Sequence, residues 1–582
     1  MPSYITPVDD IAGRVGSLVL YHTVVHRGGL DHYSRAFAII ILQKRDLMQG
    51  LFIEYVFLIL IILALVMIAN KLRLAYPIVL VVGGLGLSTM SQFSNITIDP
   101  ELVFFIFLPP LLYEAAWQIS WKEFWKWRRV IASFAFPIVI LTSCVIAYVS
   151  TALIPGFTLA LGFLLGGIIS PPDAISATTI MRQVKVPKSL LSIVEGESLL
   201  NDASSLIVFR FALAAVITGQ FHLGESATSF GLVVTLGICI GILVGFIFYA
   251  IHRWLPLTPS IEIVLTLVTP YCMYYAAEHF HYSGVLAVVS GGLLLSNKRQ
   301  SMLSYQSRIQ GVNVWTSLVF ILNGLVFLLI GLQLPSIVNQ LGDTGLATAI
   351  WYGLAISVVL ILTRLACTLG ASVFTRFVSR FITVADPNPG WKAPLIFGWA
   401  GMRGVVSLAA ALSVPLLING GQPFPYRALI LFITFIVILV TLVFQGLTLP
   451  WLIRRLNMKD RYSTIPEHKQ ELIIQKKIAL ASHRLLEEKY LVEGMQNEHL
   501  NNLLERLKLD LKHFQGSIEA PGNDPKSGLP EFQRIYLEML EEQRKLLGEM
   551  NHRAEFDEEL IRKYQALIDV EEYKLREKQL HE

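Results

Sequence analysis

The chain has 582 residues, of which 54% are apolar and only 15% are charged, with four cysteines and a mean hydropathy of +0.57. Soluble globular proteins carry about 25% charged residues, so most of this chain must lie in a solvent other than water. The charge is also uneven, because 43 of the first 453 residues are charged, against 47 of the 129 residues from Arg454 onward. These proportions exclude a single soluble domain and a secreted disulfide scaffold, and the basic stripe of a nucleic-acid-binding protein is absent from the sequence.

The first 47 residues do not have the order of basic, apolar and small residues that a signal peptide has. Lys44 and Arg45 stand directly before the first apolar segment, and Met48 begins a sequence without positive charge. Two interpretations stay open, a translation start at Met48 or an exported N-terminal extension. We assign residues 1–47 no role.

Thirteen segments of the next 400 residues are candidates for membrane spans, because a bilayer core of about 30 Å needs about 20 mainly apolar residues per helix. They lie near residues 52–70, 75–90, 102–117, 130–152, 157–180, 190–217, 229–251, 261–279, 282–297, 313–334, 346–372, 393–417 and 427–453. We therefore predict an all-α polytopic membrane domain over residues 48–453. An odd number of spans places its two ends on opposite sides of the membrane.

Lysine and arginine in the short loops indicate the orientation, because cytoplasmic loops retain them. Every second loop is basic, and these loops together hold sixteen Lys and Arg residues, whereas the alternate loops hold only Arg427. The basic loops are predicted to face the cytoplasm, and so is the chain after residue 453.

The third span contains two consecutive prolines, Pro109 and Pro110, followed by Glu114. A proline inside a helix removes a backbone donor and kinks the helix. From the pattern alone, a kinked packing helix and a cation-gating carboxylate are equally consistent with this segment.

The fifth and twelfth spans are each interrupted in the middle. Pro171 and Pro172 free carbonyl groups close to Asp173,, and glycines on both sides of Arg403 loosen the twelfth span. Irregular backbone at membrane depth is tolerated only where it lines a cavity or is buried in protein. Two broken helices in corresponding positions of two halves predict an inverted-repeat secondary transporter, and these two are seven spans apart.

The sixth span, which contains EGESLLNDASS, has the highest density of polar residues. Glu195, Ser198 and Asp202 are spaced three and four residues apart and share one helix face, with Glu197 and Asn201 beside them,. A single polar residue could serve helix packing, but ionisable groups inside a bilayer are costly. This cluster therefore predicts a transport site, with Asp202 near the middle of the span.

Arg403 needs an anionic partner, because its guanidinium stays charged. Glu197 and Glu195 are both candidates, and we predict that a pair of Glu197 with Arg403 is structural and holds the broken helices against the sixth span. Three further ionisable residues stand alone in their spans and are interpreted as helix-packing or interfacial groups: Arg210, Glu278 and Arg364.

The rest of the membrane domain gives no sign of an enzyme or of a bound cofactor. The four cysteines fall within spans without the spacing of metal ligands, and the sequence has no Walker motif for ATP. No arrangement of a nucleophile with a base stands out.

The charged region after residue 453 predicts a helical tail, residues 454–582. Apolar residues recur at helical intervals over 466–514 and 531–580, and the Gly- and Pro-rich segment GSIEAPGNDPKSGLP separates the two ranges,. A helical hairpin and a dimeric coiled coil both fit this pattern, and we expect the tail to be regulatory.

Four motifs occur in order across residues 50–453: LPPLLYEAAW, SPPDA, EGESLLNDA and GMRGVVSLAAAL. Together they resemble the monovalent cation/proton antiporters, specifically the NhaP-like and Na⁺/H⁺ exchanger branch. The resemblance implies that Asp202 of the Asn201–Asp202 pair binds the transported cation and carries the proton. It implies that the Na⁺ site is completed by Ser198, Asp173, Glu114 and a main-chain carbonyl near Pro172, where relatives often have Thr instead of proline.

The resemblance also implies that Glu197 and Arg403 form the structural ion pair and that the protein is a homodimer. With Asn at 201 rather than a second Asp, it implies one-for-one, electroneutral exchange.

The expected function is exchange of Na⁺, K⁺ or Li⁺ for protons by alternating access in the cell (plasma or inner) membrane. In a half-wet cavity, Asp202 can hold a proton or a cation but hardly both. Two alternatives stay open: a cation channel or uniporter that uses the same cavity, and a membrane-anchored sensor in which the tail acts.

Overall fold

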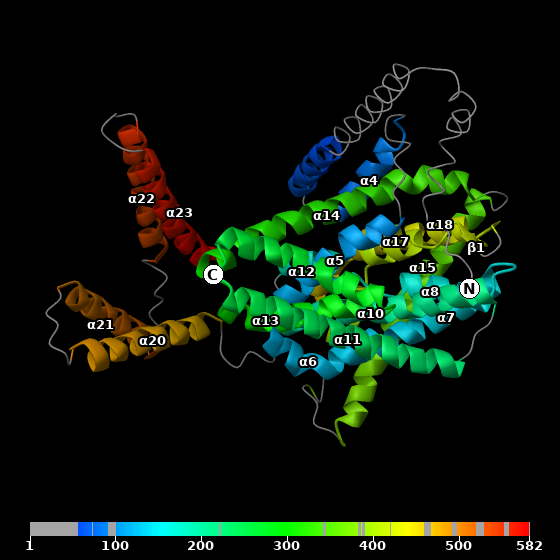
Figure 1. The fold of residues 1–582 in the computed structure, drawn as a ribbon, viewed down its shortest axis with the longest axis horizontal. Coiled ribbons are helices and arrows are strands. Elements are labelled where there is room, and N and C mark those ends of the chain that lie inside the picture. Colours follow the sequence, from blue (N-terminus) through cyan, green and yellow to red (C-terminus); the bar gives the residue numbers. More distant parts are fainter. Residues whose placement is uncertain are drawn as a thin grey trace, which may run out of the picture. The chain divides into compact units, whose positions relative to one another are not determined.

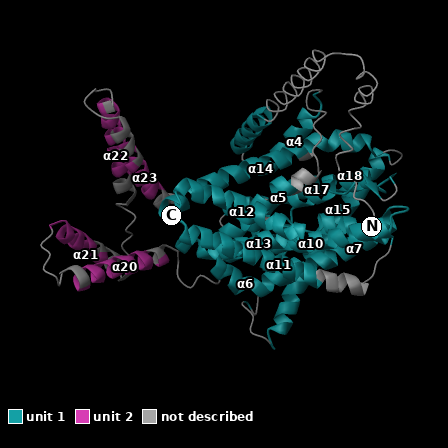
Figure 2. Ribbon diagram, in the orientation of Figure 1, with its two compact units in different colours: residues 1–459 teal, residues 460–582 magenta. Residues whose placement is uncertain are grey.

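The structure is a computed structural model that describes residues 56–580, apart from residues 73, 91–99, 185, 220–222, 342–344, 382–385, 387–389, 419–420, 459–466, 492–497, 520–528 and 552–557. The N-terminal extension, residues 1–47, lies outside the described residues. The chain divides into two compact units, residues 1–459 and residues 460–582 (Figure 2). We call them the membrane unit and the tail unit.

The membrane unit consists of helices (Figure 1), and each of the thirteen predicted spans coincides with one helix or with consecutive helices. In chain order they are Val56–Leu72, α4 (Tyr76–Leu87), α5 (Pro100–Gln118), α6 (Trp121–Ser133) with η1 (Phe134–Ile138) and α7 (Val139–Leu153), α8 (Leu159–Ile169) with α9 (Ala174–Gln183), α10 (Lys188–Thr218), α11 (Leu223–Trp254), α12 (Pro259–His279), α13 (Gly284–Met302), α14 (Tyr305–Asn339), α15 (Leu346–Val378), α16 (Lys392–Trp399) with α17 (Val405–Leu412), and α18 (Arg427–Val440) with η2 (Thr441–Gln445) and α19 (Gly446–Leu456).

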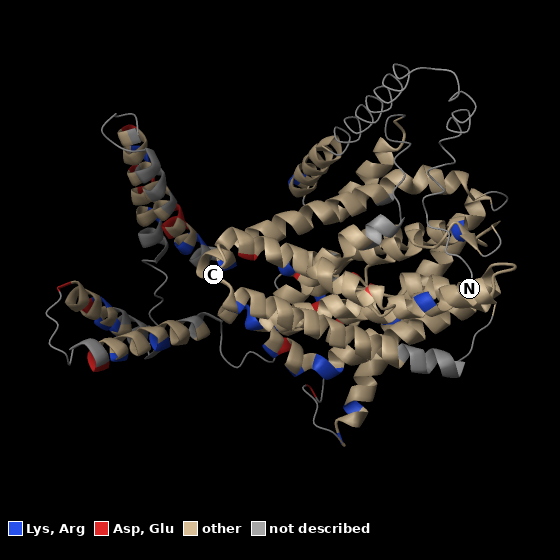
Figure 3. Cartoon of the chain, viewed as in Figure 1, with Lys and Arg blue, Asp and Glu red and all other residues tan. Residues whose placement is uncertain are grey.

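Within the described residues, seven helices are long and apolar enough to cross a membrane on their own, and three shorter apolar helices accompany them. The number of crossings therefore stays a prediction. Lys, Arg, Asp and Glu are sparse along the helices of this unit (Figure 3), as its composition predicts. A short antiparallel pair of strands, β1 (Leu417–Ile418) and β2 (Gln422–Pro423), precedes α18.

The two predicted helix breaks are confirmed. Helix α8 ends at Ile169 and α9 begins at Ala174, on either side of Pro171 and Pro172, because proline cannot donate to the preceding turn and its ring clashes with that turn. Residues 400–404, which include Gly401 and Gly404 but no proline, separate α16 from α17. The third span behaves differently, since α5 continues through both of its prolines.

The helices of the membrane unit pack as two bundles. The scaffold bundle consists of α4, α5 and α11 to α14, and the transport bundle consists of α6 to α10 and α15 to α19 with the two π-helical segments η1 and η2. Small residues allow close helix contacts: a Cβ atom added to Gly84 of α4 would lie 2.1 Å from the carbonyl oxygen of Leu328 in α14. Helices α5, α13 and α14 of the scaffold bundle contact α10, α17 and α18 of the transport bundle. Both broken helices belong to the transport bundle.

The tail unit differs from the predicted pair of long helices. It contains α20 (Glu467–Leu485) with η3 (Leu486–Leu491), α21 (Glu498–Glu519), α22 (Leu529–Asn551) and α23 (Glu558–Leu580). Helix α20 packs on α21, and α22 packs on α23. Each predicted long helix is therefore replaced by two helices that pack on one another. Their contacts bury Ala479, Leu504, Leu540 and Ile561.

Candidate functional site

The two broken helices meet at their interruptions. The backbone N–H of Asp173 donates to the carbonyl oxygen of Met402 over 2.7 Å, so the two irregular segments are joined directly. Ser176 Oγ donates to Asp173 Oδ2 over 3.0 Å. The carboxylate of Asp173 also lies against Gly404, where an added Cβ atom would be 2.3 Å from Oδ2.

Arg403 is fully buried at this crossing and binds main-chain oxygens. Its Nε donates to the carbonyl of Ile169 over 2.8 Å, its Nη2 to the carbonyl of Ser170 over 3.3 Å, and its Nη1 to the carbonyl of Gly401. The first two carbonyls lie at the C-terminal end of α8, which carries unpaired acceptors and the negative end of the helix dipole. Arg403 therefore caps the first broken helix from within the second.

Helix α10 places its polar face against the same crossing. Ser198 Oγ and Asn201 Nδ2 both donate to the carbonyl oxygen of Pro172, over 3.2 and 3.3 Å. Asp202 is 8% exposed, and its charge and that of Asp173 act on one another. The structure thus brings five of the six predicted transport residues to one place.

The oxygen of the Asn201 amide, Oδ1, is buried and has no hydrogen-bond partner among the described residues. Buried polar atoms of native proteins are nearly always satisfied, so this acceptor is available to a cation or to water. Among the described residues, no three His, Cys, Asp or Glu side chains lie close enough together to hold a metal ion. Two carboxylates with amide, hydroxyl and carbonyl oxygens instead form a donor set that suits a hard cation.

Glu114, the sixth predicted residue, has no hydrogen bond or ion pair with this group among the described residues. It lines a cavity of about 300 Å³ together with Trp117, Arg182 and residues of α12 to α14, and its Oε1 accepts from Gln118 Nε2. The described hydrogen bonds and ion pairs do not join Glu114 to Asp202. Sequence reasoning missed Tyr76 of α4, which lies within electrostatic range of both Asp173 and Glu114, and nothing in its sequence context marks it.

Glu197 has a different partner from the predicted one. Its Oε1 lies 2.8 Å from Nη2 of Arg364 in α15, and both side chains are buried. Glu197 Oε1 has no hydrogen-bond partner among the described residues, so this contact is an ion pair without hydrogen-bond geometry, while Nη2 of Arg364 donates to the carbonyl oxygen of Phe397 over 3.3 Å. The expected pair of Glu197 with Arg403 is therefore corrected, because Arg403 is already bound by carbonyl groups.

Two of the other residues interpreted as isolated are paired as well. Arg210 Nη2 of α10 lies 2.6 Å from Glu278 Oε1 of α12. At the other end of α10, Glu195 pairs with Arg182 over 2.8 Å. Among the described residues, neither candidate partner in the sixth span forms a direct ion pair with Arg403, although the charge of Glu197 acts on it.

Comparison with known proteins identifies the membrane unit. The sodium/hydrogen exchanger transmembrane family matches residues 57–455. The chain belongs to this family. The exchanger is 31% identical over 519 residues to an uncharacterised Na⁺/H⁺ exchanger of Mycobacterium tuberculosis, which covers 87% of this chain and 93% of that protein. It is 32% identical over 460 residues to a sodium, potassium, lithium and rubidium/H⁺ antiporter of Bacillus pumilus, with 76% and 66% of the two chains covered.

The fold of the exchanger is similar to a solved structure of the sodium proton antiporter MjNhaP1 from Methanocaldococcus jannaschii. The TM-score is 0.55 at 18% identity, with 71% of this chain and 100% of the other covered. The resemblance inferred from the four motifs is confirmed. The protein is a multi-pass membrane cation/proton exchanger, from a family of transporters and not of enzymes.

Proposed function

We propose that the exchanger transports a monovalent cation and a proton in turn on Asp202, by alternating access. The observation that carries the proposal is a buried carboxylate beside oxygen donors where two broken helices cross. Burial disfavours an uncompensated carboxylate, and either a proton or a cation compensates it. If the transport bundle moves only when Asp202 is compensated, an inward Na⁺ requires an outward H⁺.

The proposed ligands of the cation are Asp202 and Asp173, the hydroxyl of Ser198, the free amide oxygen of Asn201 and the carbonyl of Pro172. The last already accepts from Ser198 and Asn201, so a cation that binds there must take the place of a donor. Glu114 belongs to the proposal as a carboxylate on the path to the site, because it lines a cavity beside the N-terminal end of α10.

The finer features of the proposal are supported by the family and by the charge pattern. One-for-one exchange fits Asn at 201, since a second aspartate there would add a titratable charge. The sixteen-to-one distribution of basic loop residues, supports a cytoplasmic tail unit in a protein of the cell membrane. A homodimer is implied by the family resemblance. The Bacillus relative, named for four alkali cations, supports testing Na⁺, K⁺, Li⁺ and Rb⁺ together.

The decisive experiment uses purified exchanger in liposomes that contain a pH-sensitive dye. We expect Asp202→Asn to abolish cation-driven proton movement for every alkali cation, because an amide cannot carry the proton. Glu123→Gln, which removes a half-buried carboxylate on α6, is the matched control and should retain exchange. If the Asp202→Asn variant still shows cation-driven proton movement, the assignment of Asp202 is contradicted. If cation flux through the unmodified protein does not depend on the pH gradient, the protein is a channel or uniporter.

A further inference from the structure

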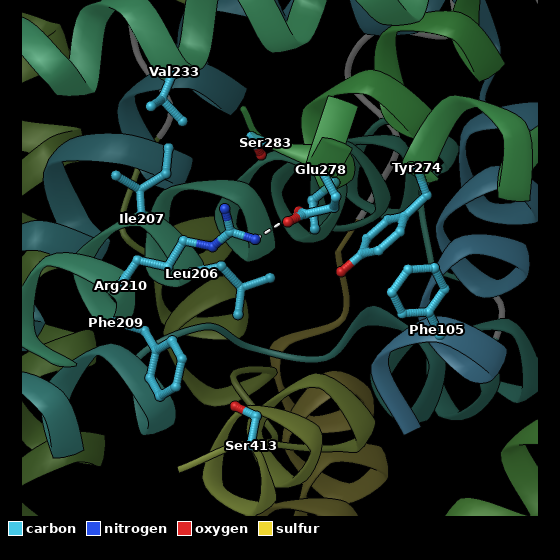
Figure 4. A pocket seen from close by; sticks show the side chains of 11 residues that line it. Phe105, Leu206, Ile207, Phe209, Arg210, Val233, Tyr274, Glu278, Ser283 and Ser413 are labelled. Atoms are coloured by element: carbon cyan, nitrogen blue, oxygen red, sulfur yellow. Dashed lines mark hydrogen bonds and ion pairs between the residues drawn. The ribbon is translucent and has the colours of Figure 1, made fainter. Parts of the chain in front are cut away.

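A second cavity, of about 220 Å³, lies between the two bundles and does not include Glu114. On the transport bundle it is lined by Leu206 and Phe209 of α10 and by Ser413, which follows α17. On the scaffold bundle its wall includes Phe105 and Tyr274, whose rings pack edge to face at 5.4 Å. Figure 4 shows these side chains around the cavity.

The two cavities lie toward opposite ends of α10. The first is lined by Arg182, the partner of Glu195, and the second is lined by Arg210. A helix rises 1.5 Å per residue, so Glu195 and Arg210 are about 22 Å apart along α10. Asp202 lies between them, and the second cavity therefore lies on the other side of the transport site from Glu114.

An ion pair crosses the second cavity. Arg210 extends from α10 to Glu278 at the end of α12, with 2.6 Å between Nη2 and Oε1 (Figure 4). This contact joins the transport bundle to the scaffold bundle. The pairs of Glu195 and Glu197 both lie within the transport bundle, so movement between the bundles leaves them intact but separates Arg210 from Glu278.

Glu278 is held in place by the scaffold bundle itself. Its Oε1 accepts from the backbone N–H of Gly284 over 3.1 Å. Gly284 is the first residue of α13, and a carboxylate is favoured at the positive N-terminal end of a helix. The position of Glu278 thus does not depend on Arg210, and the arginine can leave while its partner stays.

The exposure of the pair fits a contact that breaks and re-forms. The side chain of Arg210 is 44% exposed and that of Glu278 is 23% exposed, whereas those of Arg364 and Glu197 are 4% and 1% exposed. Exposed ion pairs are weak because water and salt screen them, while a buried pair resists separation. Of these two pairs, only Arg210 with Glu278 can separate in each transport cycle at little cost in free energy.

We propose that Arg210 and Glu278 form a gate that closes the second cavity on the outward side of Asp202. This inference rests on the proposed alternating access and on the proposed orientation. The gate opens when the transport bundle moves away from α12, and it keeps the outer path closed while the cavity beside Glu114 admits ions from the cytoplasm.

Accessibility of Ser413 from the outer face tests the gate. Ser413→Cys is introduced after the four native cysteines are replaced by serine, and the rate of reaction with a membrane-impermeant maleimide is measured from each face of sealed vesicles. We expect Arg210→Gln to raise the outer rate by about two- to fivefold, the change in an equilibrium that a partly exposed ion pair supports. Arg210→Lys, which keeps the charge, should restore most of the original rate.

Glu278→Gln should raise the outer rate equally, because its amide oxygen still accepts from Gly284 and the scaffold bundle stays intact. The outer rate of the double variant should not exceed that of either single variant, because each single substitution already removes the same contact. Lys126→Gln, whose partner Glu123 lies on the same helix, is the matched control and should leave the rate unchanged.

Outer rates that are unchanged in both single variants overturn the gate, and so does a double variant with additive effects. The maleimide rate requires no transport, so it reports on the gate even if Asp202→Asn retains exchange and the proposed function fails. Conversely, loss of exchange in Asp202→Asn with unchanged maleimide rates in the gate variants leaves the proposed function in place and removes only the gate.

Discussion

Single atoms decide how the candidate site is built. The carboxylate of Asp173 occupies the space that a side chain at position 404 would take, and Asn201 uses its amide nitrogen on Pro172 while its oxygen stays free. The site is therefore shaped by a missing side chain as much as by the polar residues present.

Gly404→Ala should displace the carboxylate of Asp173, because the new Cβ atom would lie 2.3 Å from Oδ2. Exchange should fall by up to about 100-fold, the scale set by a misplacement of about 1 Å at a reacting group. Initial rates of cation-driven proton movement in liposomes measure the effect. Gly86→Ala, whose added atom meets nothing within 4 Å, is the control, and equal rates in the two variants would contradict the packing argument.

Arg364→Gln should destabilise the exchanger, because it removes the cation that contacts the buried carboxylate of Glu197, at a cost of about 3–5 kcal/mol. Glu197→Gln combined with Arg364→Gln removes both charges and should lose less stability. The midpoints of thermal unfolding of the purified protein should follow that order. A double variant that unfolds at the same temperature as Arg364→Gln alone would show that the two side chains do not act as a pair.

Residue types in the sequence predicted most of the side chains that gather at the candidate site, but not every contact between them. The spacing of Asp202 with Ser198 fixes a helix face, and the paired prolines fix a break, because both are local properties of the chain. The partner of Glu197 depends on which helix packs against α10, and Arg364 lies more than 160 positions away. Nothing local in the sequence distinguishes it from Arg403.

At the scale of helices, the interruptions of the two broken helices contribute most to the candidate site. Arg403, in the interruption between α16 and α17, supplies donors to the end of α8, so each broken helix completes the other. The prolines of α5 leave that helix unbroken, which shows that paired prolines alone do not predict a break.

The tail unit shows the limit of periodic patterns. Residues 466–514 and 531–580 keep a helical spacing of apolar residues throughout, which predicts two long helices. The structure has two helices in each range, because burial of the apolar faces against one another is favourable. A periodic pattern therefore does not mark where one helix ends and the next begins.

Helices α22 and α23 should lose stability in acid through Glu572. Hydrogen bonds with Arg576 and Arg544 hold the pKa of Glu572 below its ordinary value. A carboxyl group of this kind stabilises the folded state above its unfolded pKa of about 4.3, and the stability is lost as the pH falls through the lower folded value. Hydrogen exchange of α23 in the full chain, corrected for intrinsic rates, should show protection that declines below about pH 4.

Glu572→Gln should flatten this pH dependence. Glu538→Gln is the control, because the pair of Glu538 with Arg534 spans 3.9 Å and both side chains are 71% exposed. If the Glu572 variant follows the same pH curve as the unmodified protein, other carboxylates control the acid response of the tail unit.

At the scale of the whole molecule, the family match covers residues 57–455 and ends near the boundary between the two units. The candidate site, both broken helices and both bundles lie within the membrane unit. Composition alone predicted this division, since the fraction of charged residues rises from under a tenth to more than a third at Arg454.

Deletion of residues 460–582 should therefore leave cation/proton exchange intact while changing its dependence on pH or on cation concentration. The rate of exchange in liposomes, measured at several pH values and cation concentrations and compared with that of the full chain, tests both expectations. A truncated protein that remains monodisperse but shows no exchange would favour the sensor alternative, in which the tail unit acts.

The hydrogen bond from Asp173 to Met402 has a consequence for the energetics of a cycle. Under the proposed alternating access, this bond favours movement of the two interruptions as one body, so that Asp173 keeps its neighbours as the bundle reorients. If the cation then keeps the same oxygen ligands in both orientations, its intrinsic affinity should be similar at the two faces of the bilayer. The concentration gradients would then set the direction of exchange.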